Sequence, residues 1–201
     1  VEDSASFSVP GYTLLTPHSE NITIAGTRYY DVAEATTADG PAITETTDMF
    51  EAEERGRKLM YEENGPSRPA RHVFSLSGIS QIPSSTWTVY YRGRSLGLAG
   101  INDNEVSFNI DILVRKADGT VRASLATNVA AAYLLNTELD TWLTKSGTYD
   151  FPGYAVVDDS DYMEIAYYGE IEGGGSSNDG YLQIMIDEGT LAAEDQTRIE
   201  A

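Results

Sequence analysis

NEVSFNIDILVRK, which occupies residues 104–116, is the stretch that decides the fold class. Taken in steps of two, its apolar side chains share one face, and they are Val106, Phe108, Ile110, Ile112 and Val114. The opposite face is polar apart from Leu113. Successive side chains of a strand point to opposite faces, so this alternation predicts a β-strand with one buried face.

An Asp-Gly pair follows this strand in the sequence ADGT, residues 117–120. Asp-Gly favours the tight turn of a β-hairpin. Residues 120–126 are therefore expected to return beside the first strand, with Val121, Ala123 and Leu125 facing the core.

Alternating segments recur on both sides of this hairpin. Residues 86–94 predict a strand with Trp87, Val89 and Tyr91 on one face, and residues 162–171 predict another. The glycine-rich residues 173–180 predict a hairpin loop that leads into a return strand over 181–187. Turn signals lie about 8–12 residues apart, as in sandwiches and barrels. The sequence predicts an all-β fold: an antiparallel two-sheet β-sandwich, jelly-roll-like, with an extended N-terminal arm.

Three segments carry helical signals. Asp48-Met49-Phe50-Glu51 fits a capping box and predicts a short helix over residues 49–58. The alternative is a loop that leads into a strand over residues 58–62. The alanine-rich residues 128–143 favour a helical turn, and the tail after residue 187 is expected to be partly helical or irregular.

The charge balance restricts the classes of partner. The 201 residues contain 13 basic and 32 acidic side chains, a net charge of −19. Nucleic acid and anionic membrane surfaces would repel such a chain. There is no cysteine, which excludes disulfides and thiolate metal sites. No stretch approaches the roughly 20 apolar residues of a membrane span, so membrane insertion is not expected.

The N-terminal segment differs from the rest. Residues 1–17 contain apolar Phe7, Val9, Tyr12 and Leu14, broken by Pro10. They form either an edge strand of the chain's own sheet or an arm that adds to a neighbour. Residues 18–201 are expected to form a single β-sandwich domain. The start at Val1 predicts a secreted, extracellular protein whose signal peptide has been removed, and Asn21-Ile22-Thr23 matches the N-glycosylation pattern.

No catalytic signature is present. The two histidines, His18 and His72, accompany no nucleophile motif. Asp111, Glu164 and Glu170 project from strands and could pair as glycosidase carboxylates, but with so many acidic residues they are better interpreted as solvated strand faces. The sequence therefore predicts a protein that is not an enzyme.

Two ligand classes remain as hypotheses. Asp158, Asp159 and Asp161 precede one strand, and a second oxygen-rich group, Asn102 to Glu105, precedes another. Such loops either bind calcium or are simple acidic turns. A glycan could stack on exposed aromatic rings, and the candidates are Tyr90, Tyr91, Tyr167, Tyr168 and Trp142. Packing or contact between subunits is the favoured interpretation of these rings.

Four runs in the second part of the chain resemble a recurrent β-sandwich module. They are HVFSLSGISQIPSSTWTVYYRGR, DILVRKADGTVRASLATNV, YAVVDDSDYMEIAYYGEI and IDEGTLAAEDQTRIE. The module is found mainly in uncharacterised archaeal secreted and surface proteins, and the resemblance covers about two thirds of the chain. More loosely, the architecture is similar to jelly-roll subunits of extracellular filaments that assemble by donor-strand complementation. The resemblance implies a structural module and carries no active site.

The functional expectation follows from these features. The chain is expected to be a structural subunit of an extracellular filament or layer that assembles with copies of itself. The N-terminal arm of one subunit would add a strand to the next. The alternatives are a carbohydrate-binding module, calcium-dependent or not, and a viral capsid or tail component.

Overall fold

The computed structural model describes residues 22–24, 27–29, 48–53, 56–62, 69–96, 105–138, 140–172, 181–186 and 197–200. The elements are β1 (Ile22–Ile24), β2 (Thr27–Tyr29), β3 (Asp48–Glu53), β4 (Gly56–Leu59), β5 (Tyr61–Glu62), β6 (Arg71–Ser75), β7 (Gln81–Ile82), β8 (Ser85–Leu96), β9 (Val106–Arg115), β10 (Val121–Leu134), the 3₁₀ helix η1 (Asn136–Glu138), β11 (Leu143–Phe151), β12 (Tyr154–Ala155), β13 (Tyr162–Ile171), β14 (Tyr181–Ile186) and β15 (Arg198–Glu200).

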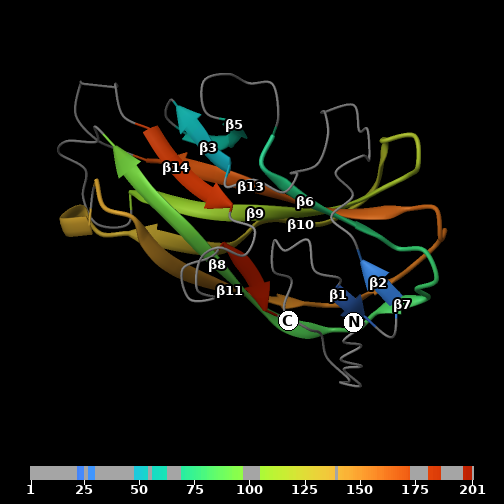
Figure 1. Cartoon of the computed structure of the whole chain (residues 1–201). Coiled ribbons are helices and arrows are strands. Elements are labelled where there is room, and N and C mark those ends of the chain that lie inside the picture. The colour runs from blue at the N-terminus through green and yellow to red at the C-terminus, as the bar shows by residue number, and fades with distance from the viewer. Residues whose placement is uncertain are drawn as a thin grey trace, which may run out of the picture.

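The strands of the two large sheets pair in a nested order. β3 pairs with β14, β4 and β6 pair with β13, β8 pairs with β11, and β9 pairs with β10, all antiparallel. The ladders β13–β9 and β14–β8 join these pairs into two sheets, β10-β9-β13-β4/β6 and β11-β8-β14-β3. The first strand pairs with the last, the second with the next to last, and so on towards the middle of the chain. This order of pairing is the jelly-roll arrangement. The predicted all-β jelly-roll-like sandwich is confirmed, and Figure 1 shows β8 and β14 crossing over β9 and β13.

Two strand positions are each filled by two separate segments. Met60 N–H donates to the Tyr167 carbonyl, and Tyr167 N–H donates to the Ala70 carbonyl, so β4 and β6 continue one another along β13. Between them the chain leaves the sheet, and β5 pairs with β3 of the other sheet. Similarly, β14 pairs with Gly93–Leu96 of β8, and β15 continues along Thr88–Tyr90. The Thr197 hydroxyl accepts from Arg92 N–H at 2.9 Å and donates to the Met185 carbonyl at 2.7 Å, which closes this second junction.

The core lies between the two sheets and is rich in aromatic rings. The Tyr91 ring of β8 stacks on Phe108 of β9 with centroids 5.7 Å apart and meets Tyr167 of β13 edge-on at 6.2 Å. Trp87 stacks on Phe151 at 4.6 Å. All five rings are buried, and a fully buried large apolar side chain contributes about 1.5–3 kcal/mol. The inward faces expected for residues 104–116 and 86–94 are thus confirmed. The expectation that Asp111 and Glu164 lie on solvated strand faces is wrong, because the outer faces of β9 and β13 are also buried at these residues.

β10 is the most irregular long strand. Its register against β9 shifts at four places, and Asn128 and Ala130 both have φ of 54°. The distorted segment is fixed from the opposite sheet, because the Tyr91 hydroxyl of β8 donates to the Ala130 carbonyl at 2.9 Å. A Cβ on Gly147 of β11 would overlap the Ala130 backbone, so β10 and β11 approach closely at this side of the sandwich.

One helix prediction is wrong, and the helical turn expected within residues 128–143 is limited to a short 3₁₀ turn. Residues 49–58 are not helical: β3 and β4 occupy this region, and the alternative of a strand near residues 58–62 is closer, since β4 and β5 fall there. A capping box contributes only about 1 kcal/mol, whereas every residue of β3 pairs with β14. The alanine-rich residues are also extended, because β10 continues to Leu134 and only the 3₁₀ turn η1 follows.

Three further expectations are corrected. β13 and β14 belong to different sheets, so residues 173–180 connect two sheets and do not close a hairpin. Val121 is 48% exposed, because the bulges of β10 bring Ala126, Ala130 and Ala132 to buried positions instead. Ala123 and Leu125 are partly buried against the core, as expected. The C-terminal tail contributes a strand, β15.

Candidate functional site

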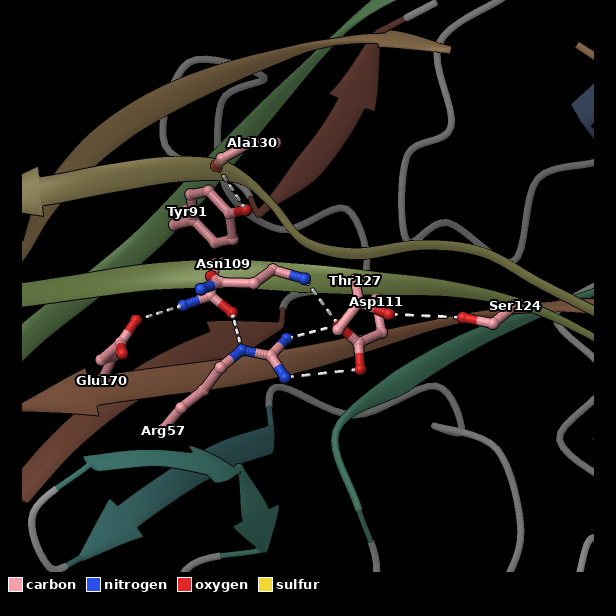
Figure 2. A network of polar contacts seen from close by, with 9 residues as sticks. Arg57, Tyr91, Asn109, Asp111, Ser124, Thr127, Ala130 and Glu170 are labelled. Carbon is pink, nitrogen blue, oxygen red and sulfur yellow. Dashed lines mark hydrogen bonds and ion pairs between the residues drawn. The ribbon is translucent and has the colours of Figure 1, made fainter. Parts of the chain in front are cut away.

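A polar network on the outer face of β9 links four strands of the same sheet, β4, β13, β9 and β10 (Figure 2). Arg57 of β4 donates to Asp111 Oδ1 at 2.5 Å through Nη2 and to Asn109 Oδ1 at 2.6 Å through Nε. Asn109 Nδ2 in turn donates to Glu170 of β13 at 3.3 Å. On the other side, Asn128 N–H of β10 donates to Asp111 Oδ1 at 2.9 Å. We call Arg57, Asn109, Asp111, Asn128 and Glu170 the Asp111 network.

The Asp111 network is largely withdrawn from water. Asn109 is fully buried and Asp111 is 8% exposed. The Arg57 guanidinium also lies 3.6 Å from the centroid of the Tyr168 ring. Burial, followed by the negative charge of Asp111, raises the pKa of the Tyr168 hydroxyl, which therefore stays protonated at neutral pH. The network ties together the strands on both sides of β9 and β13.

A second ionic cluster lies further along the same sheet face. Arg115 contacts the Glu164 carboxylate through Nε at 2.9 Å and through Nη2 at 3.0 Å. Arg71 Nη1 lies 3.2 Å from the same carboxylate. Arg115 also donates to the Gly119 carbonyl at 2.9 Å, which fixes the β9–β10 turn. Glu164 is 2% exposed. These groups, the Glu164 cluster, join β6, β9, β13 and the hairpin turn.

The chemistry of both clusters is that of structural ion pairs. Hydrolysis of a glycoside needs one protonated carboxyl group and a second ionised one on either side of a sugar. Here Asp111 and Glu164 instead each face arginine, and their oxygens already accept hydrogen bonds from it. Such buried pairs fix the relative positions of strands.

The aspartates considered for calcium are arranged around an arginine. Arg122 Nη2 donates to Asp161 Oδ1 at 2.8 Å and to Asp158 Oδ2 at 3.2 Å, and Arg122 Nε also pairs with Asp161. The Ser160 backbone N–H and hydroxyl lower the pKa of Asp158. Asp159 is exposed. Among the described residues, no group of three or more His, Cys, Asp or Glu side chains is placed to hold a metal ion. Residues 102–104 of the second oxygen-rich loop lie outside the described ranges.

His72 lies inside the sandwich. Its Nδ1 is 2.8 Å from the Tyr167 hydroxyl, and its ring meets the Tyr167 ring edge-on at 5.4 Å. Burial lowers the pKa of His72 to about 4, so the ring is neutral near pH 7. A side chain enclosed in this way is a core residue. His18 lies outside the described residues.

The five aromatic rings considered for sugar stacking divide into two groups. Tyr91 and Tyr167 are buried in the core. The other three are half-buried, and each has a guanidinium over its ring: Arg198 over Tyr90 at 3.6 Å, Arg57 over Tyr168 at 3.6 Å and Arg94 over Trp142 at 4.6 Å. A sugar stacked on those ring faces would first have to displace an arginine.

The edges of the two sheets are a further place to examine, because an added strand pairs at a sheet edge. Each large sheet ends on one side in short segments, β6 and β4 in the first and β5 and β15 in the second. Within the described ranges, no second strand pairs with β6 beyond its ladder with β13. Arg71, His72, Val73 and Phe74 of β6 are at most 5% exposed, however, so this segment is covered in the folded chain and is not an open edge.

Some sequence-derived candidates have no structural description, and some contacts were not foreseen. Phe7, Val9, Tyr12 and Leu14 of the arm and the acceptor Asn21 lie outside the described residues. Conversely, Arg57 and Arg122 were not anticipated. Arg57 reaches an acceptor 54 positions away in sequence and Arg122 one 39 positions away, and no local pattern reveals such pairs.

Comparisons with known proteins give no family. No protein-family model matches the chain, and no curated protein matches it. Among solved structures, a chain from "Structure of infectious bursal disease virus Gx strain" aligns at 10% identity with a TM-score of 0.23. The alignment covers 90% of this chain and 41% of that one. The fold assignment above rests on the strand pairing alone. No helix in the described part of the chain is long and apolar enough to span a membrane.

Proposed function

We propose that this chain is a structural jelly-roll subunit that assembles with copies of itself into an extracellular filament or layer, with the arm of residues 1–17 adding as a strand to a neighbouring subunit. The observation that carries the proposal is that the buried carboxylates of the described residues are engaged in structural ion pairs. The buried carboxylates Asp111, Asp161 and Glu164 are each paired with arginine, in contacts that hold strands together. An assembly contact would then be made by strand pairing at a sheet edge.

The composition of the arm supports strand addition. Backbone hydrogen bonds between the arm and an edge supply most of the register, and alternate side chains supply specificity. Phe7 and Val9 alternate with Ser6 and Ser8, which suits a strand with one buried face. A contact from the arm of one copy to the body of the next does not close on itself, so repetition produces a fibre. The same contact would serve a cellular filament, a surface layer or a virion shell.

Deletion of residues 1–15 tests the proposal. The truncated chain should keep its far-ultraviolet circular dichroism spectrum and cooperative melt, because the described core contains none of the deleted residues. It should sediment as a monomer where the full chain forms polymers visible by negative-stain electron microscopy. The full-length variant Phe7→Ser/Val9→Ser controls for chain length and should also fail to assemble. Polymers formed by the folded, truncated chain would refute the arm mechanism.

A further inference from the structure

β10 is a long edge strand with few of the usual protections. It has 14 residues, more than any other described strand, and it ends the sheet β10-β9-β13-β4. It contains neither proline nor glycine, and Arg122 is its only charged residue. Val121 and Tyr133, near its two ends, are 48% and 47% exposed. A long, uncharged edge of this kind tends to pair with another chain unless it is short, charged, bulged or covered.

The protection that β10 does have is the bulge at Asn128 and Ala130. Both residues have φ of 54°, in the left-handed region that residues with a Cβ rarely adopt. The ladder with β9 shifts register on both sides of Val129. A strand that approached this edge would therefore meet an interrupted row of backbone donors and acceptors.

Two side chains hold the backbone of the bulge from opposite faces of the sheet. From the core, the Tyr91 hydroxyl donates to the Ala130 carbonyl at 2.9 Å. On the outer face, Asp111 Oδ1 accepts from the Asn128 N–H at 2.9 Å. A carbonyl and an N–H are thus turned out of the plane in which a neighbouring strand would pair with them. Burial raises the pKa of the Tyr91 hydroxyl, so it stays protonated and able to donate at neutral pH.

We infer that the Tyr91 hydroxyl locks the bulge of β10, and that this lock keeps the β10 edge from pairing with the β10 edge of a second copy of the chain. Without the hydroxyl, the Ala130 carbonyl would be buried with no partner, because Ala130 is 4% exposed. Regular extended backbone relieves both that cost and the left-handed conformation, and it restores a continuous edge. A second copy is the partner because two identical antiparallel edges match about a twofold axis. The inference goes beyond the proposed function and does not depend on it.

Amide hydrogen exchange of Tyr91→Phe tests the lock. Phenylalanine keeps the ring that stacks on Phe108 and removes only the donor. Tyr167→Phe is the matched control, since it removes a buried hydroxyl that contacts His72 and not β10. Relative to the amides of β13, residues 127–132 should exchange about tenfold faster in Tyr91→Phe, the factor expected for one lost hydrogen bond. They should keep the parent rate in Tyr167→Phe. Unchanged exchange in a folded Tyr91→Phe chain would overturn the lock.

Disulfide trapping tests the consequence for association. The native chain has no cysteine, so a chain with Thr127→Cys, an exposed position near the middle of β10, forms disulfides only between two copies. Paired strands place Cα atoms about 4.5–5.5 Å apart, within the range that a disulfide bridges. Ser77→Cys, exposed in the turn after β6, controls for random collision. Adding Tyr91→Phe should raise the yield of dimer linked through residue 127 about tenfold, in proportion to the population of the open edge, and should not change the yield through residue 77.

A glycine substitution separates the bulge from general loosening of the fold. Glycine adopts φ of 54° without steric cost, so Ala130→Gly in the Tyr91→Phe chain should preserve the bulge and return the yield through residue 127 towards that of the parent. Ala126→Gly is the matched control, because Ala126 is also a buried alanine of β10 but does not have a positive φ. It should leave the yield raised. No rise in the folded Tyr91→Phe chain, or an equal fall with Ala126→Gly, would overturn the protective role of the bulge.

Discussion

Gly147 shows how a single residue controls the contact between the two sheets. A methyl group there would overlap the backbone carbonyls of Ala130 and Ala131, and backbone atoms cannot turn aside as a side chain can. Gly56 is the matched contrast, because space around it is open and only its φ of 86° disfavours alanine. We expect Gly147→Ala to lower the free energy of unfolding by about 2–4 kcal/mol and Gly56→Ala by about 1–2 kcal/mol. Urea denaturation measures both, and equal losses would contradict the steric argument.

His72 predicts an acid-sensitive stability. Its pKa is about 4 in the folded protein and near 6.5 when exposed, so between these values the unfolded chain binds a proton that the folded chain does not. Unfolding is therefore favoured progressively as pH falls from about 6.5 to 4, by roughly 3 kcal/mol in total, and this contribution is constant below pH 4. His72→Gln should be less stable at pH 7 but should lose stability less steeply between pH 6.5 and 5, where most carboxylates are still ionised.

NMR gives a direct check on His72. In a His18→Gln background the imidazole signals of His72 are the only ones present, since the chain has two histidines. Their midpoint should lie well below pH 5.5. A midpoint near 6.5 would show that the ring is not enclosed as the structure places it.

At the scale of elements, β4 is held to the sheet by Arg57 as well as by its backbone ladder. The Arg57 and Asp111 side chains are 19% and 11% exposed, so their attraction is only partly screened. A double-mutant cycle with Arg57→Met and Asp111→Asn should give a coupling free energy of about 1–3 kcal/mol. The Lys145–Glu138 pair, with 26% and 24% exposure, is the control and should couple by less than about 1 kcal/mol. Similar coupling free energies in both cycles would show that the Arg57–Asp111 pair contributes no more than an exposed surface ion pair.

The strands also show which features of the fold can be predicted from the local sequence pattern and which depend on distant partners. Strands with strict alternation, such as β8 and β9, were predicted with their inward faces because one face of each meets the core along its whole length. β3 and β10 were misread because a capping box and an alanine run describe preferences of a few residues, whereas pairing with distant strands determines the outcome. Likewise, the Arg57–Asp111 and Arg122–Asp161 pairs join residues that only the completed topology brings together. The sequence could show that these residues are charged but not which partner each one meets.

For the whole molecule, the charge of −19 should make assembly depend on salt. Two such subunits repel each other over the Debye length, which is about 10 Å at 0.1 M and about 30 Å at 0.01 M salt. The proposed arm contact is backbone pairing with apolar side chains, which screening does not weaken. Light scattering should therefore show faster polymer growth in 0.5 M than in 0.01 M sodium chloride. Growth that slows with added salt would indicate a contact dominated by opposite charges.

The nested pairing also has a consequence for biosynthesis. β14 is the partner of both β3 and β8, and β13 is the partner of β4, β6 and β9. Among the strands that the structure describes, only the β8–β11 and β9–β10 ladders and the short β1–β2, β3–β5 and β12–β7 pairs have both of their strands before the ribosome has added residue 162. The strands β3, β4 and β6 therefore cannot complete their pairing until β13 and β14 have been synthesised. A chain that ends before residue 181 lacks β14, which lies between β8 and β3 in the middle of one sheet. Such a truncated chain therefore cannot form the complete sandwich.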